Sequence, residues 1–168
     1  MEIAGIPVTV GALGSLLSAC YSVVQGINTL RQKYKFMAVT LISILNTCNG
    51  TRLVLGQVDK IFASNSSATQ HLFKQHREIF EGIKIGCAMT LSLLETHVQI
   101  LLDVAGSDGP LAAQNLGKLE RIKALYNESD MRVLHEQLKD QNATLNQILT
   151  VLQRLVLCNE QTMGISTK

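Results

Sequence analysis

The chain has 168 residues, the usual size of one domain, and its 15 basic and 13 acidic side chains leave a net charge of +2. With no Trp, three Tyr and four Phe, its core must be mostly aliphatic, which favours helices over a sheet. The charges of both signs are interspersed and no basic run is interleaved with aromatic residues, so the composition argues against a nucleic-acid-binding protein.

The first predicted element is a helix over residues 8–32. Residues 3–30 carry no charged side chain, and Pro7 suits the first turn of a helix. About 20 apolar residues in a helix cross a bilayer, so this run must be covered either by lipid or by protein. The apolar side chains expected to make that contact are Ile6, Val8, Val10, Leu13, Leu16, Leu17, Val23, Val24 and Ile27.

Small residues and a basic cluster accompany this helix. Small side chains recur along it in steps of three or four and permit close helix packing, in a membrane or in a soluble bundle. Arg31, Lys33 and Lys35 follow it and are expected to face anionic headgroups. Because Ser18, Gln25 and other polar residues dilute its hydrophobicity, three alternatives stay open: a buried bundle helix, a permanent span, and a helix shielded in one state and delivered to lipid in another.

The apolar spacing after this segment predicts four more helices, over residues 35–63, 68–104, 114–126 and 130–157. Small polar residues break the chain at 63–67, two glycines and a proline break it at 106–110, and capping residues precede the last helix at 127–130. Short connections imply antiparallel neighbours. We therefore predict an all-α antiparallel bundle of four to five helices over residues 1–157, followed by a short tail at 158–168.

The side chains that usually carry chemistry are scattered along the sequence. Cys20, Cys48, Cys87 and Cys158 lie in apolar stretches, far from the spacing of a zinc site, and are expected to be buried hydrophobes in a reducing cytosol. No nucleophile lies beside a base and no phosphate-binding loop occurs. We therefore expect no enzyme, catalytic residue, cofactor, metal or small-molecule substrate. Gln141 interrupts the last apolar seam, either fixing the helix register or touching water at its edge.

Several stretches resemble a known family. Residues 1–7, Leu16-Leu17 with Cys20, residues 53–58, residues 134–138 and Leu145-Asn146 are similar to fungal HeLo-like N-terminal domains, which stand at the front of fungal NOD-like receptor (STAND) proteins. The resemblance covers residues 1–157. It implies a non-enzymatic helical bundle in regulated cell death, whose N-terminal segment, here residues 3–27, targets membranes on oligomerisation.

The resemblance also implies partners and a location. The expected partners are further copies of the chain or a STAND-type receptor, together with anionic membrane lipid, and the expected location is cytoplasmic with membrane association on activation. The alternative is a soluble adaptor that binds a partner protein and never contacts lipid. If the first helix acts on lipid, deleting residues 1–27 is expected to abolish liposome binding and to leave the rest of the bundle helical.

Overall fold

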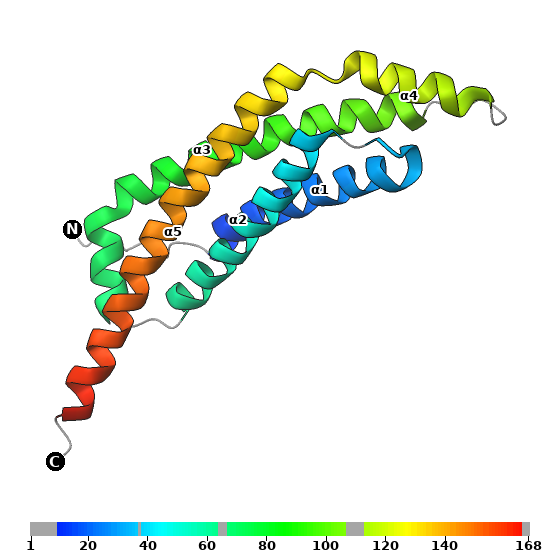
Figure 1. The fold of residues 1–168 in the computed structure, drawn as a ribbon. Coiled ribbons are helices and arrows are strands. Elements are labelled where there is room, and N and C mark those ends of the chain that lie inside the picture. Colours follow the sequence, from blue (N-terminus) through cyan, green and yellow to red (C-terminus); the bar gives the residue numbers. More distant parts are fainter. Residues whose placement is uncertain (1–9, 37, 64–66, 107–112, 166–168) are drawn as a thin grey trace.

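The computed structural model describes residues 10–36, 38–63, 67–106 and 113–165, and these residues form five helices and no strand (Figure 1). The all-α prediction is confirmed. The helices, listed in chain order, are α1 (Val10–Tyr34), α2 (Val39–Ala63), α3 (Ser67–Gly106), α4 (Ala113–Leu125) and α5 (Glu128–Ile165). Their bounds agree with the prediction to within a few residues except for α5, which continues to Ile165 where we expected it to end at 157.

The four long helices form the corners of a square bundle. α1 packs against α2 and α3, and α5 packs against the same two helices from the opposite corner, while α4 covers one end of α3 (Figure 1). Helices α1 to α4 alternate in direction, as predicted, but α5 continues in the direction of α4 and does not pack against it, so the antiparallel prediction is wrong for that pair (Figure 1). Two neighbouring pairs, α1 with α3 and α2 with α5, run parallel. Ser22 and Gly26 of α1 face Glu95 and Val98 of α3 in the same order, so α1 and α3 run in one direction.

Local signals explain where the helices begin and end. Lys35 follows α1 with a φ of 51°, the left-handed conformation that often terminates a helix and that costs a non-glycine residue about 1 kcal/mol. The Asn127 side chain accepts hydrogen bonds from the backbone N–H groups of Ser129 and Asp130, at 3.1 and 3.3 Å, and so caps α5. The predicted break at 127–130 is therefore confirmed with its mechanism.

Aliphatic side chains from all five helices fill the core, and aromatic pairs lie at its two ends. Phe36 after α1 packs edge-on against Tyr126 before α5, with ring centroids 5.2 Å apart. Phe62 of α2 packs in the same manner on Phe80 of α3, at 5.5 Å. Edge-to-face pairs of this kind contribute about 0.5–1.5 kcal/mol beyond the area that they bury. These aromatic contacts stabilise the packing at the two ends of the bundle.

Polar side chains that interrupt the apolar faces of the helices form hydrogen bonds to a neighbouring helix or to their own helix. The Gln141 amide of α5 donates to the Thr90 hydroxyl of α3 at 3.1 Å, while its buried Oε1 has no protein partner. Thr51 is buried and bonds the Thr47 carbonyl of its own helix at 2.9 Å. Of the two readings left open for Gln141, the contact with α3 favours a role in helix register.

One glycine sets how closely α1 approaches α3. A Cβ placed on Gly26 would lie 2.4 Å from Cγ1 of the buried Val98 side chain, whereas a Cβ on Gly14 of the same helix would meet nothing within 4 Å. Val98 is branched at Cβ and stiff at χ1, so it cannot turn aside without cost. The glycine is therefore required for this helix contact.

We expect Gly26→Ala to lower the free energy of unfolding by about 1–3 kcal/mol because the added methyl overpacks the α1–α3 contact. The matched change Gly14→Ala should raise the free energy of unfolding by about 0.5–1 kcal/mol, since alanine favours a helix where nothing obstructs its methyl. Urea unfolding of both variants measures the two effects. Equal shifts of the same sign would contradict the close approach of α1 to α3.

Candidate membrane and interaction surfaces

The apolar side chains that we expected on lipid lie inside the bundle wherever the structure describes them. Leu13, Leu16, Val23, Val24 and Ile27 are buried, and Leu17 is partly buried against the same core. Val10 begins α1, but its side chain lies outside the described side chains, as do all of Ile6 and Val8. In the folded bundle this apolar face is covered by α2 and α3, so it is not presented to solvent or lipid.

The opposite face of α1 is exposed and uncharged. Gly14, Ser18, Tyr21 and Gln25 lie on this face, and Ser22 at its edge donates a hydrogen bond to the Glu95 carboxylate of α3. An exposed helix face in water tolerates charge readily and usually carries it. The core does not require this absence of charge.

Arg31, Lys33 and Lys35 are all exposed where α1 ends and turns into α2. Within the described residues, no ion pair involves any of the three. The structure thus keeps the predicted basic cluster together and accessible, at the end of the bundle where α1 meets α2. The cluster is available to an anionic surface.

The outward side of α3 is a surface that the sequence analysis missed. Its exposed large apolar side chains are Ile79, Ile85, Met89, Leu93 and Ile100. The predicted seam of α3 is buried as expected, at Phe80, Cys87, Leu94 and Val98 among others. The sequence does contain a sign of this surface. Several positions of α3 between its buried apolar residues are also apolar, and a helix with one face in solvent does not require them to be.

This helix is also the one whose length and composition would suit a membrane span. Among the described residues, Glu78–Val104 of α3 is the one stretch that is long and apolar enough to cross a membrane, and 33% of its most apolar window is buried inside the bundle. Core helices of soluble proteins share these properties, so the stretch is weak evidence for a span. The sequence analysis predicts no membrane role for α3.

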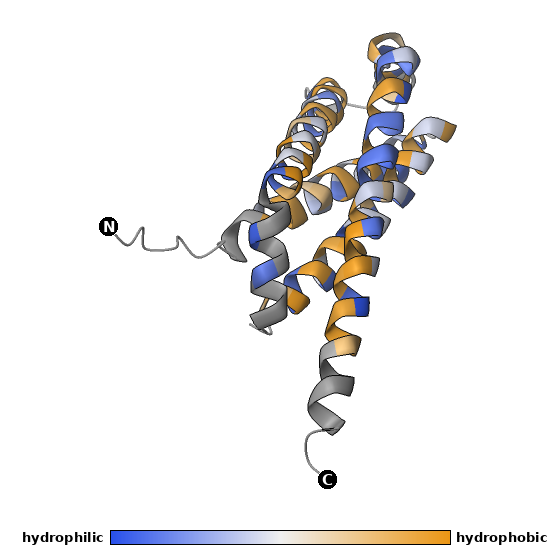
Figure 2. Ribbon diagram, turned by 90° about the vertical axis from the view of Figure 1, so that its left-hand side faces the viewer, coloured by the Kyte–Doolittle hydropathy of each residue, from blue (hydrophilic) through white to orange (hydrophobic). Residues whose placement is uncertain are grey.

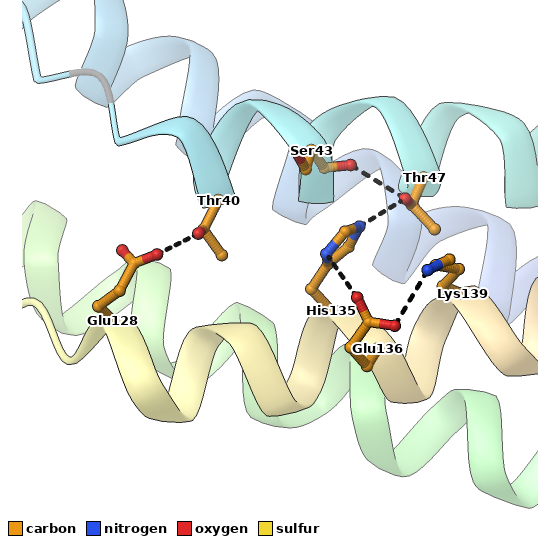
Figure 3. A network of polar contacts seen from close by, with 7 residues as sticks. All are labelled: Thr40, Ser43, Thr47, Glu128, His135, Glu136 and Lys139. Carbon is orange, nitrogen blue, oxygen red and sulfur yellow. Dashed lines mark hydrogen bonds and ion pairs between the residues drawn. The ribbon is translucent and has the colours of Figure 1, made fainter.

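A row of polar contacts joins α2 to α5, which run parallel (Figure 3). The Thr40 hydroxyl of α2 donates to the Glu128 carboxylate of α5. About two turns further along both helices, His135 Nε2 lies 3.1 Å from the Thr47 hydroxyl. Lys139 pairs with Glu136 at 3.1 Å beside them. The hydrogen bond from Thr40 lowers the pKa of Glu128, while burial and the nearby Glu128 raise the pKa of Tyr126.

These contacts help to fix the register of α2 against α5. The Thr47 hydroxyl donates its proton to the Ser43 carbonyl of its own helix at 3.0 Å, so this proton is not directed at His135. Within the described ranges, no group of three or more His, Cys, Asp or Glu side chains is placed to hold a metal ion. The row is best explained as helix packing.

An open groove lies where α5 passes the end of α2. It has a volume of about 500 Å³ and is lined by Gln57, Lys60, Ile61, Gln153, Val156 and Leu157. Figure 2 shows the apolar residues along this end of α5, next to the part drawn in grey. Among the described residues that line this groove, Lys60 is the only one with a titratable side chain.

Three of the cysteines are buried as predicted, and the fourth is not. Cys20, Cys48 and Cys87 lie in the core on α1, α2 and α3, whereas Cys158 of α5 is exposed. Burial raises the pKa of Cys20 and of Cys48 to about 12, and that of Cys87 to about 11. The buried thiols are therefore neutral and unreactive near neutral pH.

Comparison of the chain with protein-family models, with curated proteins and with solved structures finds no match.

Proposed function

We propose that the chain is a non-enzymatic signalling domain of the HeLo-like type, whose N-terminal apolar helix engages membrane lipid when copies of the chain associate. The proposal rests on the resemblance stated above and on one observation. α1 carries no charge from Val10 to Leu30 even on the side that faces solvent, and the basic cluster that follows it forms no ion pair with the residues that the structure describes. A helix that only packs in a soluble bundle does not need an uncharged outer face, whereas a helix that enters lipid does.

The burial of α1 determines how such a domain would act. Seven described side chains of α1 are buried: Leu13, Leu16, Cys20, Val23, Val24, Ile27 and Leu30. Burying one large aliphatic side chain contributes about 1.5–3 kcal/mol, so withdrawing this face into water would cost about as much as the 5–15 kcal/mol that stabilises a typical domain. α1 would therefore leave the bundle only where lipid or a neighbouring copy replaces the lost contacts.

A second candidate function is an adaptor that binds protein and not lipid. The exposed apolar side of α3 favours it, because contiguous apolar surface on a soluble protein commonly marks a site of association. The partner in that case would be another copy of the chain or a STAND-type receptor. Neither candidate involves a cofactor or a small-molecule substrate.

The membrane proposal is tested by adding one charge to the exposed side of α1. We expect Ser18→Asp to reduce binding to phosphatidylserine-containing vesicles about 100-fold, because a charge near the centre of a spanning helix costs about 2.5–3.5 kcal/mol. Ser18 is exposed, so the folded bundle loses no core contact. Gln147→Asp, which adds the same charge to an exposed position of α5, should bind vesicles like the unmodified protein. Co-sedimentation measures both.

The cysteines report whether α1 leaves the bundle. Without vesicles, a water-soluble thiol reagent should modify the exposed Cys158 rapidly and leave the three buried thiols protected. With vesicles, release of α1 should make Cys48 and Cys87 reactive, since both helices then lose their cover. Protein that stays in the supernatant with every vesicle composition would contradict the membrane proposal. Binding with the thiols still protected would show that the intact bundle contacts lipid and that α1 does not.

A further inference from the structure

We propose that the folded bundle docks on an anionic membrane through the end where α1 passes into α2 and α4 passes into α5. This inference rests on the proposed function, which requires contact with lipid, and it names the surface that makes the first contact. That surface, the docking end, consists of the exposed side chains of Arg31, Lys33, Lys35, Val39, Lys123 and Leu125.

Contacts between distant parts of the chain place these residues at one end of the bundle. The rings of Phe36 and Tyr126 pack edge-on with their centroids 5.2 Å apart. These two residues directly follow Lys35 and Leu125 in the sequence. The hydrogen bond from Thr40 to a carboxylate of α5 joins the first turn of α2 to the first turn of α5. In Figure 1, the end of α1, the start of α2 and the junction of α4 with α5 all lie at this end of the bundle.

The charge at this end is positive. The described residues of 28–40, 100–106 and 113–132 include seven basic and four acidic side chains, and none of the seven bases forms an ion pair with a described residue. Three of the four acids already accept hydrogen bonds from uncharged side chains: Asp103, Glu128 and Asp130. Anionic lipid attracts such a surface, and because the attraction extends over about 10 Å at 0.1 M salt, the basic groups need not share one plane.

The backbone does not favour the third lysine of this end. Arg31 and Lys33 lie in the last turn of α1, where positive charge complements the helix dipole. Lys35 lies beyond the helix with a φ of 51°, a conformation that glycine adopts without strain and lysine does not. A lysine at this position therefore supports a role for its charged side chain.

Two exposed apolar side chains accompany these charges. Val39 is 79% exposed and Leu125 is 51% exposed. The boundary between headgroups and acyl chains offers phosphate groups to basic side chains and hydrocarbon to apolar ones, within the roughly 5–10 Å that an interfacial segment penetrates. Basic and apolar side chains together therefore fit an anionic lipid surface.

Docking at this end determines which part of α1 meets lipid first. α1 has 25 residues, so its first residue lies about 36 Å from its last. In the docked state the last turn of α1 is next to the headgroups, and its buried apolar side stays inside the bundle. The uncharged part of α1 reaches lipid only in a later step, when the bundle opens.

The first test removes the charge of the docking end with the triple variant Arg31→Gln, Lys33→Gln, Lys35→Gln. We expect it to bind phosphatidylserine vesicles about 100-fold more weakly, since each base near an anionic surface contributes about fivefold. The matched control has the same net charge and replaces exposed bases at the opposite end, Lys60→Gln, Lys74→Gln, Arg154→Gln; it should bind like the unmodified protein. Raising salt from about 0.1 M to about 1 M should weaken binding of the control and leave the residual binding of the first variant unchanged.

The second test removes the apolar side chains. Val39→Ser combined with Leu125→Ser should weaken vesicle binding about tenfold, because both side chains then lose their contact with hydrocarbon. Leu53→Ser combined with Val151→Ser removes the same two kinds of side chain from exposed positions outside the docking end and should bind normally. All these positions are exposed, so urea unfolding of every variant should match that of the unmodified protein.

The third test locates the contact. A polarity-sensitive dye on Gln32→Cys, in a Cys158→Ala background, should report lipid when phosphatidylserine vesicles are added, whereas the same dye on the exposed Cys158 of the unmodified protein should stay in water. Lipid contact at Cys158 and not at residue 32 would overturn the docking end. Equal loss of binding by both triple variants would also overturn it, as would equal binding to uncharged phosphatidylcholine vesicles.

The docking end and the proposed function can fail separately. If the triple variant at residues 31–35 binds vesicles normally while Ser18→Asp does not, the docking end is wrong and the proposed function stands. If the triple variant loses binding while Ser18→Asp keeps it, with Cys48 and Cys87 still protected, the docking end is confirmed and the role of α1 in lipid is contradicted.

Discussion

Deletion of residues 1–27 is expected to abolish cooperative unfolding of the protein. The deletion removes most of α1, including six of its seven described buried side chains, and leaves the facing sides of α2 and α3 uncovered. α2 and α3 contact each other little, so neither can cover the other. We expect retained helical circular dichroism, strong binding of a dye that reports exposed apolar surface, and a broad urea transition, as in a compact state without fixed packing.

This expectation keeps the helicity that the sequence analysis predicts for the remaining helices and adds that their fixed packing is lost. If the deletion variant fails to bind vesicles, the loss could therefore come either from the missing α1 or from the lost packing of the other helices. A matched pair of substitutions makes the distinction. Val23→Asp places a charge in the core and should reproduce the effect of the deletion, whereas Gln25→Asp lies two residues away on the exposed side and should unfold cooperatively. Cooperative unfolding of Val23→Asp would contradict the packing of α1.

Raising the pH above about 9 is expected to destabilise the bundle steeply. The thiols of Cys20, Cys48 and Cys87 have an ordinary pKa of 9.0, and burial raises it to about 12, 12 and 11 in the folded protein. The folded state therefore prefers the protonated thiols. Their contribution is fully present below pH 9 and is lost as the pH rises through 9 towards the folded values. Three such groups together cost about 4 kcal/mol of stability per pH unit in that range.

Urea unfolding at neutral pH and at several pH values above 9 measures this slope. Replacing any one buried thiol by alanine should reduce the slope by about one third, although the small cavity lowers stability at neutral pH. Cys158→Ala should leave the slope unchanged because that thiol is exposed. A slope that does not respond to any of the three core substitutions would show that other groups control the alkaline transition.

The helices could be predicted from the sequence because their signals are local. The apolar spacing of α2, α3 and α5 and the breaks before α3, α4 and α5 placed most helix ends within a few residues. The end of α5 is predicted too early because the apolar seam stops at Leu155, although no proline or glycine follows Leu157 before Gly164. The cysteines illustrate the same limit: position within an apolar stretch predicted burial for three, but Cys158 lies on the exposed side of its helix.

The candidate surfaces were less predictable. The sequence identified α1 as unusual and named its apolar side chains, but it could not tell whether lipid or protein covers them, since both environments favour the same residues. The structure places the described ones against α2 and α3. The exposed apolar side of α3 was overlooked because its composition alone does not say which of its sides faces the core.

The sequence by itself thus determined five helices, their approximate ends, the uncharged character of α1 and the basic cluster that follows it, because each depends on residues close together along the chain. Only the tertiary structure decided that α1 packs beside α3 in a parallel pair and that its apolar side is buried. It also decided which apolar side chains of α3 remain exposed. These properties depend on which helix faces meet across the core, and that pairing is set by the joint packing of residues far apart in sequence.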